Sequence, residues 1–426
     1  MSAPAPAPLT PRSDVLGRAR AAAARRVLDA VARRVDVDLV VDGRATGHPA
    51  GRPGTADDRP RIVVHRPDAF YRRLGTHPKL AIGEGYTEGE WAPAPGHDLA
   101  EVLLPFAERL DDAVPEPLRS LRGLTDTPLP AALRNTLTGA RRNIEAHYDL
   151  SNEMFASFLD PSMTYSSALF EEGRPLAGQN LQEAQLRKVD AALDRAGVGT
   201  GTRLLEVGTG WGTLALRAAQ RGASVVTVTL SREQAALAEK RLAEAGLADR
   251  VDVRLQDYRE VEGEFDAIVS IEMVEAVGEE FWPTYFATLD ARLGPGGSAV
   301  VQAITMPHER YRATRRSFGW IQKYIFPGGV LPSVDAIERT CTRHTGLRVR
   351  DVHTFGQHYA ETLRRWRLAF ADAVTGGQVR ELGFDERFQR IWEFYLAYCQ
   401  AGFTAGAIDV GQIVLNRPAR GPVAAG

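Results

Sequence analysis

The feature that most constrains the fold of this chain is a glycine-rich stretch, Thr202–Thr213. It reads Thr-Arg-Leu-Leu-Glu-Val-Gly-Thr-Gly-Trp-Gly-Thr, so a short apolar run ends in three alternating glycines, and a helix-like segment follows. Glycines at this spacing allow a tight turn and a close approach of the backbone to a ligand. The following helix directs its free amide hydrogens at that ligand. The pattern fits a dinucleotide fold, a methyltransferase or an ordinary strand-to-helix turn.

The composition of the chain argues against several classes of protein. Its 426 residues leave room for two or three domains. With 44% hydrophobic and 25% charged residues, it is typical of a soluble globular protein, and its formal net charge of −2 predicts no nucleic-acid partner. Two cysteines are too few for a disulfide framework or a metal cage, which suits a reducing cytosol. No apolar run of about 18 residues is present, so we expect a cytoplasmic protein without a membrane span or a metal site.

The N-terminal segment has two distinct parts. Residues 1–11 are rich in alanine and proline and are expected to form a disordered tail without the apolar region of a signal peptide. An arginine-rich segment follows, in which Val27, Leu28, Val31 and Val35 recur at helical spacing. A basic amphipathic helix of this kind fits an anionic membrane surface. It fits equally well a surface helix packed on its own domain.

The chain is expected to contain two domains. Residues 12–122 are predicted to form the N-terminal domain, with strands at 36–41 and 61–65. Within it, Leu80–Trp91 mixes glycines with aromatic residues, as turns between short strands would. Residues 123–138 contain two prolines and are predicted to be a linker. Residues 139–426 are predicted to form the second domain.

The second domain alternates between strand and helix patterns. Strands are predicted at 203–207, 224–229, 250–255, 266–271 and 297–303, with helices at 181–196, 212–221, 232–245 and 280–292. Short βα units in this order predict an α/β fold with a doubly wound, mostly parallel sheet and helices on both faces. Two further strands, 347–352 and 407–415, flank an aromatic-rich helical region at 361–400. Such a sheet binds its ligand outside the carboxyl ends of its strands.

The ends of the strands distinguish a dinucleotide site from a methyl-donor site. A dinucleotide site usually has an acidic residue at the end of the second strand, to hold the ribose. That strand instead ends with Thr229 and Ser231, and Gln234 follows in the next helix; all three can hydrogen-bond a ribose. After the third strand, Gln256–Arg259 offers a carboxylate and an aromatic ring to an adenine. The fourth strand leads into Ile271–Gly278, Ile-Glu-Met-Val-Glu-Ala-Val-Gly.

These stretches together resemble the cyclopropane-fatty-acyl-phospholipid synthases. That family includes the mycolic acid cyclopropane synthases and relatives that make methylene- or methyl-branched fatty acids. The resemblance implies a class I methyltransferase with a Rossmann-like fold that uses S-adenosylmethionine. The matching segments are His147–Ser151, Glu206–Gly212, Thr229–Ser231 with Gln234, Gln256–Arg259, Met273–Glu275, Tyr324–Gly328 and Phe355 with Tyr359. Gly83–Trp91 matches the members that act on phospholipids, which implies a lipid- or membrane-associated N-terminal domain.

The resemblance also implies which residues bind the cofactor. They are Tyr165, Ser166, Glu206, Gly208, Gly210, Gly212, Thr229, Leu230, Gln234, Gln256, Asp257, Tyr258 and Arg259. Their chemistry agrees with such roles. The glycines would let the backbone reach the methionine portion, Gln234 suits the ribose diol, and Tyr258 would lie near the adenine. Glu206 would order the glycine turn or reach the ammonium group through water.

The reaction of this family requires positioning and a base. A cis double bond is a weak nucleophile, so it must be aligned with the sulfonium methyl group in a dry cavity. The resulting carbocation can be stabilised by aromatic faces, for which the candidates are Tyr165, Trp320, Tyr324, Phe326 and Tyr359. In the family the base is a bound bicarbonate, held by a polar cluster whose glutamate and tyrosine match Glu275 and Tyr359. His147, the first residue of the matching segment His147–Ser151, is also expected to be catalytic.

Three positions depart from the family pattern. Ser167 stands where a cysteine is usual, and Ala276 and Gln302 stand where histidines are usual. Ser167 and Gln302 can still hydrogen-bond an oxyanion, but neither offers a titratable imidazole. The residues implied to bind the cofactor match the family, whereas three positions near the base are altered. This pattern predicts that methyl transfer is retained and that the fate of the carbocation changes. We therefore expect a methylene-branched fatty acid, which a downstream reductase would saturate to a methyl branch.

Other functions fit parts of the pattern. Closure of a cyclopropane ring is the first alternative, and a lipid-binding protein that has lost catalysis is the second. A methyltransferase of a soluble metabolite would need neither the first domain nor the aromatic-rich helical region. The expected partners are unsaturated phospholipid acyl chains at the inner face of the membrane and, from the resemblance, a second copy of the chain. An acyl tunnel could be lined by residues that could equally be plain core: Trp366, Phe370, Phe388, Trp392, Phe394, Tyr395 and Tyr398.

Overall fold

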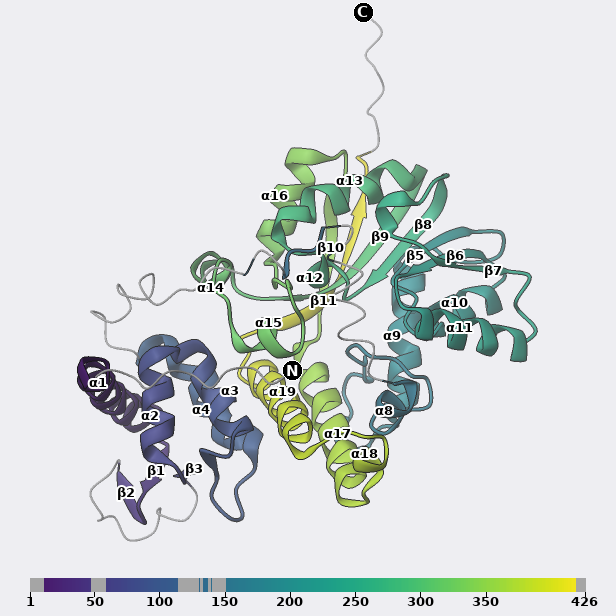
Figure 1. Cartoon of the computed structure of the whole chain (residues 1–426). Helices are drawn as coiled ribbons and strands as arrows, with labels where there is room; N and C mark the ends of the chain where they lie inside the picture. The colour runs from purple at the N-terminus through teal and green to yellow at the C-terminus, as the bar shows by residue number, and fades with distance from the viewer. Residues whose placement is uncertain are drawn as a thin grey trace, which may run out of the picture. The chain divides into compact units, whose positions relative to one another are not determined.

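The computed structural model describes residues 11–46, 59–113, 130, 133–136, 139 and 151–418, which form two compact units (Figure 1). The first unit consists of Met1–Thr127, Phe318–Trp320 and Asp385–Ala401, and the second consists of Pro128–Ser317, Ile321–Phe384 and Gly402–Gly426. Most of the predicted linker and nearly all of the predicted tail lie outside the described residues. The predicted domain boundaries stay predictions.

The first unit is built on a small mixed sheet in the order β2-β1-β3-β4. Its strands are β1 (Asp38–Val41), β2 (Arg44–Thr46), β3 (Arg61–Val64) and β4 (Trp91–Pro93). The central strands β1 and β3 are parallel, and each edge strand is antiparallel to its neighbour. The helices are α1 (Pro11–Val35), α2 (Pro67–Thr76), α3 (Pro78–Thr87), α4 (Leu99–Ala113) and most of α19 (Glu386–Thr404).

Helix α1 uses its apolar stripe inside the first unit. Leu28, Val31 and Val35 are buried, and the helix contacts α2 and α4. Of the two readings of this helix, the structure therefore supports the one in which it packs on its own domain. Burial of these side chains removes apolar surface from water and ties the basic helix to the unit.

The prediction of turns between short strands at Leu80–Trp91 is wrong, because α3 occupies most of this segment. Pro78 stands in the first turn of α3, where its missing amide hydrogen is not needed. The glycines of the segment serve close packing. An added Cβ at Gly83 would lie 2.5 Å from the Trp320 ring, and one at Gly85 would lie 2.8 Å from the Phe70 ring.

Replacing Gly83 with alanine should therefore destabilise the first unit. The new methyl group would force the Trp320 ring to move, and overpacking of this kind lowers the free energy of unfolding by about 1–3 kcal/mol. Chemical denaturation would measure the change. Gly17→Ala is the matched control, since a Cβ there meets nothing within 4 Å. A Gly83→Ala protein as stable as the control would contradict this packing.

The second unit contains a seven-stranded sheet in the order β10-β11-β9-β8-β5-β6-β7. Its strands are β5 (Arg203–Val207), β6 (Ser224–Thr229), β7 (Val251–Leu255), β8 (Phe265–Ile271), β9 (Leu293–Thr305), β10 (Arg348–Thr354) and β11 (Asp409–Asn416). Strands β5 to β9 are parallel to one another, and β11 runs antiparallel to both β9 and β10. The predicted α/β fold with a mostly parallel sheet is confirmed, although β9 is longer than expected.

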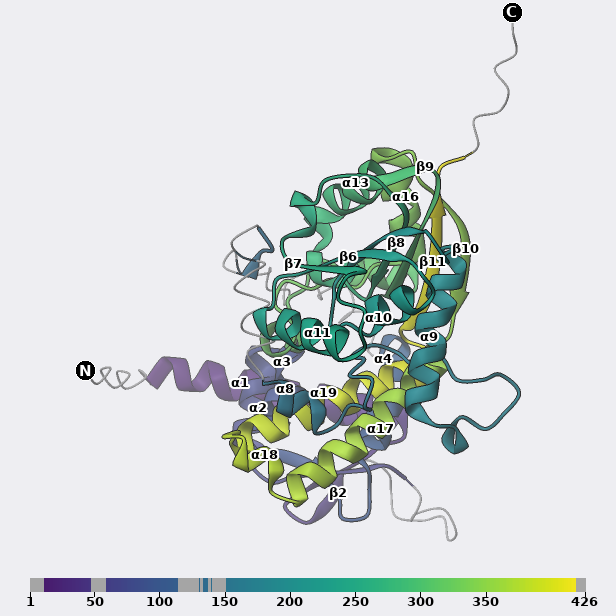
Figure 2. The same cartoon turned by 90° about the vertical axis from the view of Figure 1, so that its right-hand side faces the viewer.

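Helices cover both faces of this sheet (Figure 2). One face carries α9 (Leu181–Arg195), α10 (Thr213–Gln220) and α11 (Arg232–Glu244), and the other carries α13 (Trp282–Arg292) and α16 (Val334–His344). Successive strand residues belong to different cores: Leu204 packs with the α9–α11 side, and Leu205 packs with the α13 and α16 side. A strand that is buried on both faces reads as a continuous apolar run.

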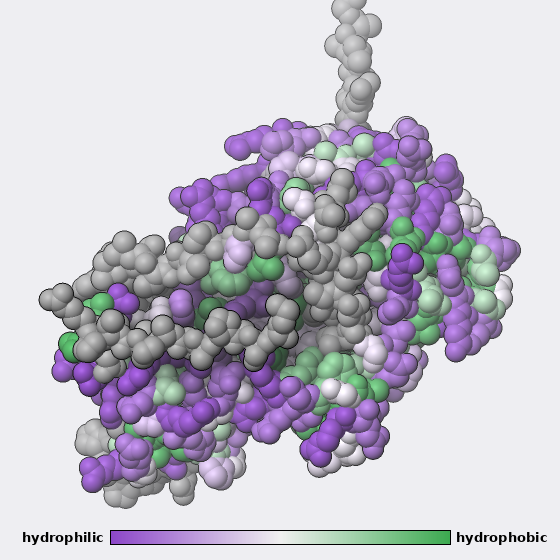
Figure 3. Space-filling model, viewed as in Figure 1, coloured by the Kyte–Doolittle hydropathy of each residue, from purple (hydrophilic) through white to green (hydrophobic). Residues whose placement is uncertain are grey.

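The remaining elements connect the strands or extend beyond them. They are α8 (Asn152–Ala156), η2 (Leu176–Gly178), η3 (Tyr258–Glu260), α12 (Val274–Val277), η4 (Glu279–Phe281), α14 (His308–Thr314), α15 (Trp320–Tyr324), α17 (Gly356–Thr375) and α18 (Gln378–Glu381). On the side shown in Figure 3 the surface is mostly hydrophilic, with apolar residues gathered in separate groups. Among the helices that the structure describes, none is both long and apolar enough to cross a membrane.

Candidate active site

The glycine turn lies between β5 and α10, and each of its three glycines has a positive φ angle. Gly208, Gly210 and Gly212 have φ angles of +99°, +51° and +85°. A Cβ at Gly208 would lie 2.6 Å from Met273, and one at Gly212 would lie 2.9 Å from Ala238. A Cβ at Gly210 would meet nothing within 4 Å. Two of the glycines therefore make room for the chain itself, and Gly210 leaves open space over the turn.

Glu206 lies buried under this turn, at 3% exposure. Its Oε2 accepts a hydrogen bond from the Thr227 hydroxyl at 2.6 Å, and that hydroxyl lies 2.8 Å from the hydroxyl of Thr209 in the turn. Burial raises the pKa of Glu206 to about 8, against the smaller opposing effects of Thr227 and Lys188. The carboxyl group thus ties β5 and β6 to the turn.

The carboxyl end of β6 presents a second polar group. The Thr229 hydroxyl donates to Gln234 Oε1 at 2.9 Å, and the Ser231 side chain caps α11 by accepting from the Gln234 amide. Gln234 is buried at 6% exposure, and Leu230 is partly buried. These contacts hold the Gln234 side chain in one place beside the glycine turn. Its contact with a ribose stays a prediction.

The four residues after β7 have partners within the chain. Asp257 accepts two hydrogen bonds from the Arg259 guanidinium, at 2.8 and 2.7 Å. The Tyr258 ring lies in the core cluster, 5.5 Å from the Tyr285 ring, and Gln256 donates to the carbonyl of Glu260. The Asp257 carboxylate and the face of the Tyr258 ring, which were expected to address an adenine, therefore serve the fold. Cofactor contact by this segment stays a prediction.

An aromatic wall lies at the same end of the sheet, and it contains Tyr165. The Tyr165 ring lies 5.1 Å from Phe155 and 5.4 Å from Trp366. The contacts continue from Phe155 to Trp211, from Trp366 to Tyr359, and from Tyr359 to Phe403. We define the aromatic wall as Trp211, Phe155, Tyr165, Trp366, Tyr359 and Phe403. Trp320 packs in the first unit instead, against Gly83 and Phe394.

The predicted base cluster is brought together around a residue that the sequence analysis did not select, Glu272. Its Oε1 accepts from the Ser167 amide at 3.0 Å and from Gln302 Nε2 at 2.8 Å. Its Oε2 accepts from the Tyr359 hydroxyl at 2.7 Å. Glu272 has a φ of +51°, in the left-handed region. It is the first residue after β8, and that position at the carboxyl edge of the sheet is the signal that could have found it.

Glu275 occupies a different environment on α12. Its Oε1 accepts from the Ile304 amide, and its Oε2 is buried without a partner among the described residues. Burial and, secondly, the neighbouring Glu272 raise the pKa of Glu275 to about 8. Glu275 is thus mostly neutral at pH 7. The structure pairs Tyr359 with Glu272 rather than with Glu275.

Two further residues were missed, Lys188 and Gln412. Lys188 is 1% exposed and donates to the Ser166 hydroxyl. Burial lowers the pKa of Lys188 to about 8, while the charges of Glu272, Asp160 and Glu206 oppose that shift. Gln412 donates to Gln302 Oε1 at 3.2 Å, which turns Gln302 Nε2 toward Glu272. Neither residue stands in a recognisable motif, because both act through contacts that are distant in sequence.

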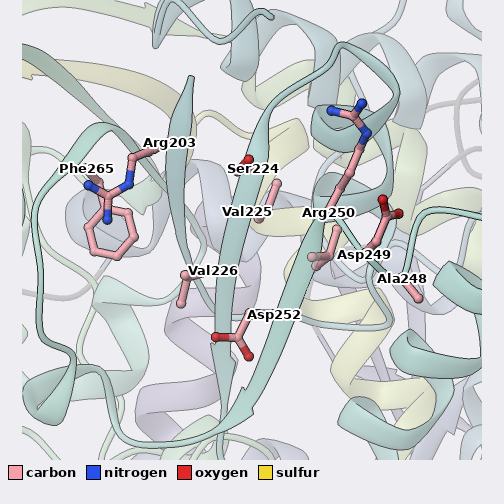
Figure 4. Close-up of a pocket in the computed structure, with 10 residues that line it drawn as sticks. Arg203, Ser224, Val225, Val226, Ala248, Asp249, Arg250, Asp252 and Phe265 are labelled. Atoms are coloured by element: carbon pink, nitrogen blue, oxygen red, sulfur yellow. The ribbon is translucent and has the colours of Figure 1, made fainter. Parts of the chain in front are cut away.

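His147, predicted as catalytic, lies outside the described residues. An open pocket lies at the amino ends of the strands, and it is lined by Arg203, Ser224, Asp252 and Phe265 among others (Figure 4). It contains none of the predicted site residues and lies at the opposite end of the strands from the glycine turn.

Replacing Glu275 with glutamine should change how stability depends on pH. The folded protein holds this proton up to about pH 8, whereas an unfolded glutamate releases it near pH 4.5. The contribution of this protonated carboxyl group to the free energy of unfolding is complete below pH 4.5 and is lost as the pH rises to 8. A glutamine at this position does not titrate, so the variant does not lose stability in this way. The variant should therefore gain about 2–4 kcal/mol relative to the parent between pH 5 and pH 8. Denaturation curves at several pH values measure this.

The matched control is Glu361→Gln. Arg364 and Arg365 keep the pKa of the Glu361 carboxyl below its ordinary value, although burial opposes them. The stability from this carboxylate is present above the ordinary pKa and is lost only in acid. The free energy of unfolding of Glu361→Gln should therefore differ from that of the parent by an amount that stays constant from pH 5 to pH 8. If the difference for Glu275→Gln is also constant over this range, Glu275 is not protonated in the folded protein at neutral pH.

With this sheet order and glycine turn, the chain has the fold of the class I S-adenosylmethionine-dependent methyltransferases, to which the solved structures that it resembles belong. The family described as mycolic acid cyclopropane synthetase matches residues 135–413. This chain belongs to that family.

Individual relatives agree with this assignment. The chain is 49% identical to tuberculostearic acid methyltransferase UfaA1 of Mycobacterium tuberculosis, over 94% of this chain and 92% of the relative. It is 35% identical to the cyclopropane-fatty-acyl-phospholipid synthase of Escherichia coli, over 84% and 87%. Mycolic acid cyclopropane synthase CmaA1, solved in complex with SAH and CTAB, matches 65% of this chain and 97% of its own, with 33% identity and a TM-score of 0.58.

Proposed function

We propose that this protein methylates the cis double bond of an unsaturated fatty acyl chain of a phospholipid and leaves a methylene branch. The observation that carries this proposal is the altered base cluster, in which Ser167, Gln302 and Tyr359 surround the Glu272 carboxylate. The similarity to a tuberculostearic acid methyltransferase, at 49% identity, supports it over ring closure. The 35% identity with a cyclopropane-forming relative keeps ring closure as the alternative.

The residues of the glycine turn and of β6 fit S-adenosylmethionine. The space over Gly210 admits a ligand, and Thr229 holds Gln234 at the adjoining strand end. When bound, S-adenosylmethionine would supply a methyl group carried on a positively charged sulfur. The π electrons of the acyl double bond would form the new bond to the methyl carbon, and the sulfur would keep the electron pair of the broken S–C bond. Gly208 and Gly212 keep the turn in shape against Met273 and Ala238.

The aromatic wall protects the carbocation that methylation leaves on the acyl chain. Aromatic faces attract a cation, and their bulk excludes the water that would capture it. Tyr165 and Tyr359 belong to the wall, and Tyr359 also reaches the base cluster through its hydroxyl. The wall and the cluster together can thus hold a cation next to a proton acceptor.

The product depends on how the cation loses a proton. If a proton leaves the new methyl group while its C–H electrons bond to the cationic carbon, a cyclopropane ring closes. If a hydride first moves from the methylated carbon to the cationic carbon, loss of a methyl proton gives an exo-methylene group. Three of the groups predicted to hold bicarbonate, Ser167, Gln302 and Tyr359, are already bound to Glu272, so they do not fit bicarbonate.

The remaining partners belong to the same proposal. Phospholipid acyl chains place the reaction at the inner face of the cell membrane, with the N-terminal domain as the lipid-associated part. An exo-methylene product would need a reductase to become a methyl branch. A homodimer, expected from the resemblance, stays a prediction.

One experiment tests the product. The protein is incubated with S-adenosylmethionine and dioleoyl phospholipid vesicles, and the fatty acid methyl esters are analysed by mass spectrometry and proton NMR. Vinylidene protons are expected, and cyclopropane ring protons at high field would establish the alternative instead. Acyl lipid binding without affinity for S-adenosylmethionine, measured by calorimetry, would favour a lipid-binding protein without catalysis.

A further inference from the structure

The Glu272 carboxylate occupies the centre of the cluster that the reaction needs for its base. Three hydrogen-bond donors converge on it from three separate segments of the second unit: Ser167, Gln302 on β9 and Tyr359 on α17. These donors belong to the cluster that was expected to hold a bicarbonate ion together with Glu275. A carboxylate presents the same forked pair of oxygens as bicarbonate, so Glu272 satisfies the donors with an oxyanion that belongs to the chain.

The carboxylate retains the capacity to accept a proton. Two carboxylate oxygens offer about four acceptor positions, and the cluster uses one of those on Oε2 and two on Oε1. Tyr359 joins Glu272 to the aromatic wall, where the cation is expected.

The charges around the cluster divide the two glutamates into different roles. Burial raises the pKa of Glu272 above its ordinary value, although Lys188 and the three donors favour the ionised form. Glu275 has only backbone amides as donors and lies against Glu272, and its pKa is raised to about 8. The side-chain donors and the lysine that favour an ionised carboxylate thus surround Glu272 and not Glu275.

We propose that Glu272 is the base of this reaction, in place of a bound bicarbonate. The inference rests on the proposed function, because it requires a carbocation on the acyl chain. A carboxylate oxygen of Glu272 takes a proton from the carbon of the transferred methyl group. The electrons of that C–H bond form the new π bond or the ring bond, and Glu272 becomes a neutral acid that later returns its proton to water.

Two substitutions of Glu272 separate a base from a structural residue. Glu272→Gln keeps the size of the side chain but cannot accept the proton. Glu272→Gly is compatible with the backbone, because a φ of +51° suits glycine, and it opens a space lined by the three donors. The matched control is Glu361→Gln, a carboxylate on α17 that is paired with Arg364 and Arg365.

The assay uses the full chain, S-adenosylmethionine and dioleoyl phospholipid vesicles in buffer freed of carbon dioxide. The parent and Glu361→Gln should turn over at the same rate with or without added bicarbonate. Both Glu272 variants should lose about 10²–10⁴-fold in turnover while keeping their affinity for S-adenosylmethionine by calorimetry. Added formate or bicarbonate should restore Glu272→Gly and leave Glu272→Gln inactive, because only the glycine variant has room for the anion.

The outcomes distinguish this inference from the function on which it rests. A parent enzyme that needs bicarbonate, or a Glu272→Gln variant with parental turnover, overturns Glu272 as the base and leaves methyl transfer in place. Failure of small anions to restore a folded Glu272→Gly variant that still binds S-adenosylmethionine also counts against it. A parent protein that methylates no acyl chain overturns the proposed function, and the inference with it.

Discussion

Gly210→Asn should bind S-adenosylmethionine at least tenfold more weakly than the parent, with the fold intact. Asparagine tolerates the left-handed backbone at a φ of +51°, so the substitution adds little strain. Its side chain would project into the space over the turn, where a Cβ now meets nothing within 4 Å. Loss of that space removes about 1.4 kcal/mol or more of binding free energy. Calorimetric titration with S-adenosylmethionine or its demethylated product measures the change.

Two other glycines serve as controls for this result. Gly246→Asn carries the same kind of substitution at a φ of +67°, also with open space around the Cβ, but at the end of α11. It should bind the cofactor like the parent. Gly208→Ala should weaken both stability and binding, because its Cβ would lie 2.6 Å from Met273. Parental affinity in Gly210→Asn would show that the ligand does not approach the turn at this residue.

Lys188→Met should lower the free energy of unfolding by about 1–3 kcal/mol at pH 7, the range for removing one partner of a buried polar group. Methionine fills a similar volume, but it removes the buried ammonium group, whose charged form the carboxyl groups of Glu272, Asp160 and Glu206 favour. It also removes the donor to the Ser166 hydroxyl. The carboxylates would then either remain uncompensated or take up protons. Urea denaturation followed by circular dichroism measures the loss.

Lys240→Met is the control for the buried lysine. Lys240 is exposed on α11, with its Nζ 3.9 Å from Glu244, and surface pairs of this kind contribute little. Its removal should change stability by no more than about 0.5 kcal/mol. If Lys188→Met were as mild as Lys240→Met, the lysine would not balance the charges beneath the site.

The architecture of the second unit follows closely from its sequence. Apolar runs such as Leu204–Val207 identify strands that are buried on both faces, and the glycine turn indicates the end of the sheet where a ligand binds. The first unit is harder, as α3 demonstrates. Its glycines resemble turn residues locally, and only their contacts with Trp320 and Phe70, far away in the sequence, explain why a helix contains them.

The candidate site could be predicted where motifs adjoin strand ends. Ser167, Gln302 and Tyr359 were selected from the sequence, and the structure brings them to one carboxylate. The identity of that carboxylate was missed, because resemblance directs attention to Glu275 three residues later. Lys188 was missed for another reason: on an amphipathic helix, a lysine is expected at the surface, and its burial depends on the packing of α9 in the folded unit.

A carboxylate built into the chain also bears on how the cell supplies the reaction. Bicarbonate is in equilibrium with dissolved carbon dioxide. The rate of an enzyme that uses bound bicarbonate as its base therefore depends on the carbon dioxide concentration in the cell. Glu272 is synthesised with the protein and held by Ser167, Gln302 and Tyr359. If Glu272 is the base, fatty acid methylation by this protein should continue unchanged in cells grown with little carbon dioxide.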